Sequence, residues 1–140
     1  MKFEHTLQIA APVSVVWEVS TDVERWPEWH PLISNIERVD KGDFQVGSSA
    51  RIKQSGLPDT KWTVTTLTPG KQFSWETKVL GMHMIGSHEL SATDTGTENV
   101  LKVEVTGFVT WLLWPMLWSS LPWALNQENT GLKSRCEGTA

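Results

Sequence analysis

The segment WLLWPMLWSSLPWALNQ, residues 111–127, holds four tryptophans and no charged residue. From its first residue onward, largely apolar residues recur every three or four positions, at Trp111, Trp114, Trp118, Leu121, Leu125, Asn129, Leu132 and Cys136. This spacing predicts one face of an α-helix that runs nearly to the C-terminus. Pro115 suits the first turn of that helix, and Pro122 is expected to bend it. A helix of this length with an apolar face can cover a sheet, so this segment decides the fold.

The same segment is a poor candidate for a membrane span. Its 17 residues include six that are Pro, Ser, Asn or Gln, whereas a spanning helix needs about 20 predominantly apolar residues. The helix nevertheless carries more apolar side chains than one sheet can cover, namely Leu112, Leu113, Met116, Leu117 and Trp123. This surplus is typical of a contact surface, so a homodimer and a transient contact with a membrane surface are both expected possibilities.

Upstream of this helix, the chain predicts a sheet preceded by two short helices. Residues 3–10 alternate between apolar and polar side chains and predict a half-buried strand. A short helix follows Pro12, and the capping-box spacing of Thr21 and Glu24 predicts a second one that ends at Trp26-Pro27. From about Ser34 onward, turn signals separate the strand-like segments SARIKQ, KWTVTTL, QFSWETKVL, MHMIGSHEL and NVLKVEVTGFV. The order predicts an α+β fold with an antiparallel meander.

Composition narrows the function classes. The chain has 140 residues, which predicts one domain over residues 1–140. Its net charge is −4 and it has no basic tract, so no nucleic-acid partner is expected. Cys136 is the sole cysteine, which excludes an internal disulfide and fits a reducing cytoplasm. The polar N-terminal segment does not resemble a secretory signal. Nine tryptophans can fill a core or line an apolar cavity.

Alternation along the strands predicts which side chains face inward. Among them, His88 shares a face with methionines, where it could orient a ligand or move a proton, or be satisfied by a neighbouring group. His5 has the same parity and a weaker case. His30 lies in the loop WPEWHP, which could rim a cavity, and an exposed loop histidine is the favoured interpretation. The predicted ligand-binding residues are Trp29, Trp62, Trp75, Thr77, Met82, Met84, His88, Trp118, Leu121, Leu125 and Asn129.

Motifs for metal or nucleophilic chemistry do not occur in the sequence. The histidines lack metal-ligand spacing, and there is no HExxH, CxxC, GxSxG or glycine-rich phosphate loop. No metal site and no cofactor are therefore predicted. Glu76, Glu89 and Glu104 are expected to face outward, so the interior lacks the paired carboxylates that cyclisation of a poly-β-ketone would use. This pattern argues against strong catalysis.

The order of elements and several motifs resemble a known family. The matching residues are Val16-Trp17, Asp22, Trp26, Trp29, Pro31, Trp62, Pro69-Gly70, Phe73 and Trp75, with GSHEL, TGTENV and GLKSRCE further along. They resemble the polyketide cyclase/dehydrase and lipid-transport family of the SRPBCC, or START/Bet v 1-like, superfamily. The resemblance implies a helix-grip fold, in which a seven-stranded curved antiparallel sheet wraps around a long C-terminal helix. Two short helices follow the first strand, and a cavity separates sheet and helix.

The resemblance also limits the functions to be considered. Members bind sterols, lipids, quinones, plant hormones or aromatic polyketides, some are cyclases or aromatases, and some stimulate a chaperone ATPase. The favoured prediction is binding or transport of a lipid-like or aromatic polyketide-like small molecule. One alternative is a cyclase, aromatase or dehydrase-type enzyme that uses His88 as general acid or base. Another is a protein-interaction module that uses the Trp-rich helix.

Overall fold

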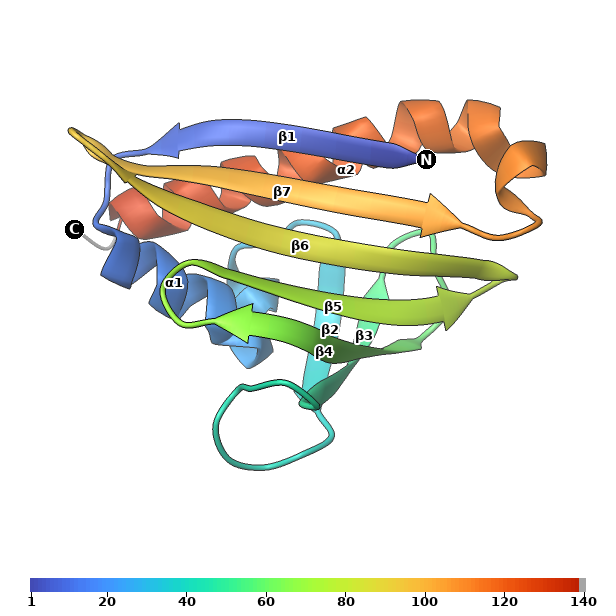
Figure 1. Ribbon diagram of the computed structural model, residues 1–140, viewed down its shortest axis with the longest axis horizontal. Helices are drawn as coiled ribbons and strands as arrows, with labels where there is room; N and C mark the ends of the chain where they lie inside the picture. Colours follow the sequence, from blue (N-terminus) through green and yellow to red (C-terminus); the bar gives the residue numbers. More distant parts are fainter. Residues whose placement is uncertain (139–140) are drawn as a thin grey trace.

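The alternating segments of the sequence form a single sheet, and the long periodic segment forms the helix beside it (Figure 1). The computed structural model describes residues 1–138. In chain order the elements are β1 (Lys2–Ile9), α1 (Val13–Thr21), the 3-10 helix η1 (Val23–Glu28), β2 (Ile33–Arg38), β3 (Ser49–Gln54), β4 (Thr60–Thr68), β5 (Gln72–Val79), β6 (Met82–Thr93), β7 (Gly96–Thr106) and α2 (Thr110–Gly138).

The seven strands pair in the order β1-β7-β6-β5-β4-β3-β2, and every pair is antiparallel. Strands β2 to β7 follow one another as a meander, and β1 adds to the far edge of β7. The sheet curls, and α2 packs against β1 and β7 on its inner side (Figure 1). The helix-grip architecture expected from the sequence is thereby confirmed.

The second short helix differs from its prediction. Thr21 does not cap it, because its hydroxyl donates a 2.8 Å hydrogen bond to the carbonyl of Trp17 one turn earlier. Asp22 stands at the N-terminal end of η1 without a side-chain capping bond, and Pro27 lies inside the element. A capping box requires a hydroxyl that points forward. Here Thr21 ends α1, so the predicted capping box is wrong.

The buried face of α2 also differs from its prediction in the first three turns. Trp111, Trp114 and Trp118 are between 52% and 62% exposed, whereas Leu117 is buried. The side chains that pack on the core are spaced four residues apart, at Leu113, Leu117, Leu121 and Leu125. Only one row of side chains along a helix can face the sheet. The leucine row takes that place, so the tryptophans lie beside it, and Trp118 packs its edge on Phe3.

The N-terminal half of α2 therefore carries an apolar surface open to solvent. Its exposed members are Trp111, Leu112, Trp114, Met116, Trp118 and Trp123, and the exposed Phe108 lies just before the helix. Within residues 1–138, no helix is long and apolar enough to cross a membrane. A homodimer and a transient contact with a membrane remain predictions, and both contacts would use this apolar surface of α2.

Close packing of α2 on the loop after η1 yields a test of the fold. A Cβ added at Gly131 would clash with the carbonyl oxygen of Trp29. Alanine is favoured over glycine in a helix by about 1 kcal/mol, yet Gly131→Ala is expected to lower the free energy of unfolding by about 2 kcal/mol because the backbone must move apart. Gly138→Ala is the control, because no atom of residues 1–138 that could obstruct its added Cβ lies within 4 Å. Urea unfolding measures both, and a stabilised G131A would contradict the packing.

Candidate functional site

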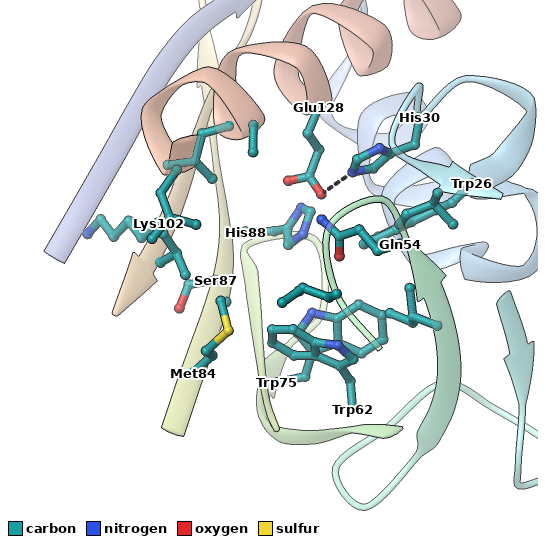
Figure 2. Close-up of a pocket in the computed structure, with 18 residues that line it drawn as sticks. Trp26, His30, Gln54, Trp62, Trp75, Met84, Ser87, His88, Lys102 and Glu128 are labelled. Carbon is teal, nitrogen blue, oxygen red and sulfur yellow. Dashed lines mark hydrogen bonds and ion pairs between the residues drawn. The ribbon is translucent and has the colours of Figure 1, made fainter. Parts of the chain in front are cut away.

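A pocket of about 110 Å³ lies between the sheet and the middle of α2. Its two sides differ in character (Figure 2). Trp62, Trp75 and Met84, from β4, β5 and β6, form an aromatic and thioether floor. His30, His88 and Glu128 stand on the side toward α2 and make that side polar. The pocket therefore has one apolar and one polar end.

The floor exists because inward positions on adjacent strands carry large rings. Trp75 of β5 lies opposite Gly86 of β6 in the strand register. The rings of Trp62 and Trp75 lie 5.8 Å apart at a tilt of 42°. Gly86 leaves open the space beneath them, since a Cβ there would sit 3.6 Å from both rings. A larger residue at this position would occupy the pocket.

On the polar side, His30 and Glu128 form a hydrogen-bonded pair. The side chain of His30 is 3% exposed and that of Glu128 is 15% exposed. The backbone N–H of Leu32 donates to Nδ1 of His30 at 3.3 Å. Because Nδ1 accepts this bond, Nε2 carries the ring proton and donates it to Oε1 of Glu128 at 3.0 Å. The loop after η1 thus fixes both the tautomer of His30 and the position of the carboxylate.

Glu128 is held in its ionised form. Burial raises the pKa of its carboxyl, but the hydrogen bond from His30 and the electrostatic interactions with His30 and His88 act in the opposite direction. The resulting pKa lies below the ordinary value for glutamate. The pocket accordingly holds a negative charge next to an aromatic floor at neutral pH.

His88 of β6 is the buried imidazole opposite this carboxylate, and it is 3% exposed. Its ring stacks on Phe73, with centroids 4.5 Å apart and planes 8° apart. Burial lowers its pKa below the ordinary histidine value, and the charge of Glu128 offsets part of that shift. His88 is therefore neutral near pH 7. Its Nδ1 is buried and has no hydrogen-bond partner within residues 1–138.

The structure brings some of the predicted ligand-binding residues to this pocket and separates others from it. Those that line it are Trp62, Trp75, Met84, His88, Leu121 and Leu125. Those that do not are Trp29, Thr77, Met82, Trp118 and Asn129. Met82 is buried in the core. Thr77 donates to the carbonyl of Lys61 at 2.7 Å, so its hydroxyl is satisfied by the neighbouring strand.

Asn129 serves the fold rather than the pocket. It is fully buried, and its Oδ1 accepts a 2.8 Å hydrogen bond from Nδ2 of Asn99. Its own Nδ2 lies 2.9 Å from Nδ1 of His5 and 3.2 Å from the His5 carbonyl. These bonds tie α2 to β1 and β7 and supply the partners that a buried amide needs. His5 belongs to this network, so its inward parity has a structural explanation.

The hydrogen-bonded pair of His30 and Glu128 was not identified from the sequence as part of the pocket. The interpretation of His30 as an exposed loop histidine is wrong, because η1 and α2 cover it and Glu128 binds it. Glu128 was missed, although Leu121, Leu125, Glu128 and Leu132 follow the helical spacing of the buried face. A lone carboxylate on that face, after the uncharged segment 107–127, was the available signal.

The sequence matches a family model described as "Polyketide cyclase / dehydrase and lipid transport" over residues 1–137. No curated protein matches the chain.

Several solved structures share the architecture. The Zhui aromatase/cyclase of Streptomyces sp. R1128 is 20% identical, with a TM-score of 0.82, and the match covers 98% of this chain and 93% of that one. A START superfamily protein of Mycobacterium smegmatis is 14% identical, with a TM-score of 0.76, and the match covers 99% of both chains. A protein of Thermus thermophilus is 14% identical with a TM-score of 0.81, and the match covers 100% of this chain and 99% of that one. At these identities the likeness shows the fold.

Proposed function

Because the chain belongs to the polyketide cyclase/dehydrase and lipid transport family, we propose that it binds or carries a hydrophobic aromatic small molecule in the pocket between β4–β6 and α2. The observation that supports this most is the division of the pocket into a tryptophan floor and a polar side, where Nδ1 of His88 has no hydrogen-bond partner among residues 1–138. Binding sites for small molecules combine apolar walls with a few polar groups in this way.

The size of the pocket limits the ligand in this conformation. Its volume is about 110 Å³, whereas drug-sized ligands occupy sites of about 300–1,000 Å³. An engineered apolar cavity of about 150 Å³ takes up benzene. A single aromatic ring is therefore about the largest ligand expected to enter without movement of Trp62 or Trp75. A polyketide with several fused rings would require these side chains to change rotamer.

A substitution on β6 tests whether the pocket is the binding site. Gly86→Val places three carbons beneath the rings of Trp62 and Trp75, in a strand that accommodates valine well. We expect the affinity for a single-ring aromatic probe such as toluene or phenol to fall at least about tenfold, which corresponds to about 1.4 kcal/mol. Isothermal titration calorimetry measures the affinity.

The matched control for this experiment is Ser91→Val, an exposed position on the same strand. It adds a β-branched side chain of equal size without entering the pocket, so its affinity is expected to equal that of the unmodified protein. Unchanged affinity in the Gly86 variant, with unfolding curves that show an intact fold, would place the ligand elsewhere.

A cyclase, aromatase or dehydrase-type enzyme is the second candidate. The observation that favours it is the neutral, buried His88, whose lowered pKa suits a general base at neutral pH. Glu128 lines the same pocket and would stabilise an imidazolium formed there. His88→Gln separates the two candidates: turnover lost with affinity retained supports the enzyme, and affinity lost without measurable turnover in either protein supports the carrier.

A further inference from the structure

We propose that the pocket selects a neutral single-ring aromatic molecule that carries a hydroxyl group, and that it rejects the corresponding aromatic carboxylate. This inference rests on the proposed function, because it concerns the ligand of the same pocket. It follows from how Glu128, His88 and Lys102 are placed and paired (Figure 2).

The carboxylate of Glu128 has one acceptor left for a ligand. Its Oε1 receives the Nε2–H of His30 at 3.0 Å. Its Oε2 has no hydrogen-bond partner within residues 1–138. A carboxylate oxygen that is open to a pocket accepts a charge-assisted hydrogen bond strongly. A ligand that donates a hydrogen bond therefore matches this end of the pocket, as a phenolic O–H does.

His88 supplies the complementary half of the same recognition. A neutral imidazole has one nitrogen that donates and one that accepts. Neither nitrogen of His88 has a hydrogen-bond partner in the described part of the chain. A hydroxyl oxygen both donates and accepts, so a single ligand oxygen can donate to Glu128 and accept from the N–H of His88. A methyl group in the same place would satisfy neither residue.

Among residues 1–138, the pocket offers no cationic side chain that is available to pair with a ligand carboxylate. Lys102 contributes to the lining, but its ammonium pairs with Glu89 at 2.9 Å in a half-exposed position on the outer face of the sheet. Gln54 offers only a neutral amide. A ligand carboxylate would therefore meet the ionised Glu128 without compensation, and two like charges repel strongly where water is excluded.

Three probes of similar size test the proposal on the unmodified protein at about pH 7.5, above the ordinary histidine pKa: phenol, toluene and benzoate. Affinity is measured by isothermal titration calorimetry. We expect phenol to bind at least about tenfold more tightly than toluene, because a charged acceptor gains a partner. Benzoate is expected to bind at least about a hundredfold more weakly than phenol. Equal affinities of toluene and phenol, or of benzoate and phenol, would overturn the inference while leaving the proposed function intact.

Binding of none of the three probes would overturn the proposed function and this inference with it. Glu128→Gln then separates charge from shape, since it keeps the size of the side chain and removes the charge. We expect benzoate to gain at least about tenfold and phenol to weaken. Glu104→Gln on β7 is the control, because it alters the net charge of the protein equally from outside the pocket. If E128Q does not fold, the three-probe comparison still decides.

Discussion

Replacement of Trp26 by alanine is expected to lower the free energy of unfolding by about 3–5 kcal/mol. Trp26 is 2% exposed, and among residues 1–138 it is the largest fully buried side chain. Its ring centroid lies 5.3 Å from that of Trp75 and 5.4 Å from that of His88. The indole N–H also donates to the carbonyl of Ser20 at 3.2 Å. The substitution removes the aromatic contacts, leaves a void and removes the hydrogen bond to the buried carbonyl of Ser20.

Urea unfolding followed by far-ultraviolet circular dichroism is the suitable measurement, because tryptophan fluorescence itself changes in the variant. Trp123→Ala is the matched control, since that side chain lies in the exposed part of α2 and its removal is expected to change stability by about 0.5 kcal/mol or less. A loss below about 1 kcal/mol for W26A would mean that the elements around η1 collapse into the void, and the packing described here would be wrong.

The second large effect is expected for His30→Leu, which should destabilise the protein by about 3 kcal/mol at pH 7. The leucine fills the space of the ring but removes the donor of Glu128, so a carboxylate is left buried without its partner. His83→Leu is the control, because His83 and Glu76 form a similar 2.8 Å contact with side chains that are 33% and 42% exposed. An exposed pair contributes at most about 1 kcal/mol.

The pH dependence of this effect has a definite sign. In the unmodified protein the pKa of Glu128 is lowered, so its contribution to stability is present above the ordinary glutamate value of 4.5 and is lost as the pH falls through the folded-state value. Without His30, burial is opposed only by His88, and the carboxyl binds a proton more readily in the folded state. The difference in stability between H30L and the unmodified protein is therefore expected to shrink between pH 7 and about pH 4. A difference that grows on acidification would contradict the assigned pairing.

The fold was largely predictable because its elements carry local signals. Period-2 alternation and turn residues located the strands, and the steps of three and four located α2. The face of α2 was harder, because its first turns are apolar all round. When Trp114 and Leu117 are equally apolar, periodicity cannot tell which one meets the sheet. Contacts with strands that are distant in the sequence decide which residue faces the sheet, and a short stretch of sequence does not contain those contacts.

The pocket residues on the strands were predictable, whereas His30 and Glu128 were not. Inward parity found Trp62, Trp75 and His88, because a strand fixes where alternate side chains point. His30 lies in a short turn between η1 and β2, where neither helical nor strand periodicity predicts the direction of a side chain. Its burial depends on α2, which returns about a hundred residues later and brings Glu128 to it. The pair arises from two segments that are adjacent only in the folded chain.

The pairing of β1 with β7 has a consequence for synthesis of the protein. The amino group of Met1 donates to the carbonyl of Val105, 104 residues later. A ribosome that adds about 5–20 residues per second exposes β1 for on the order of 5–20 s before β7 emerges. During that time the apolar side chains of β1 have no sheet to join, and α2 is made later still. The core is therefore complete only after α2 has been made, which leaves a hydrophobic strand open to chaperones or to misassociation during translation.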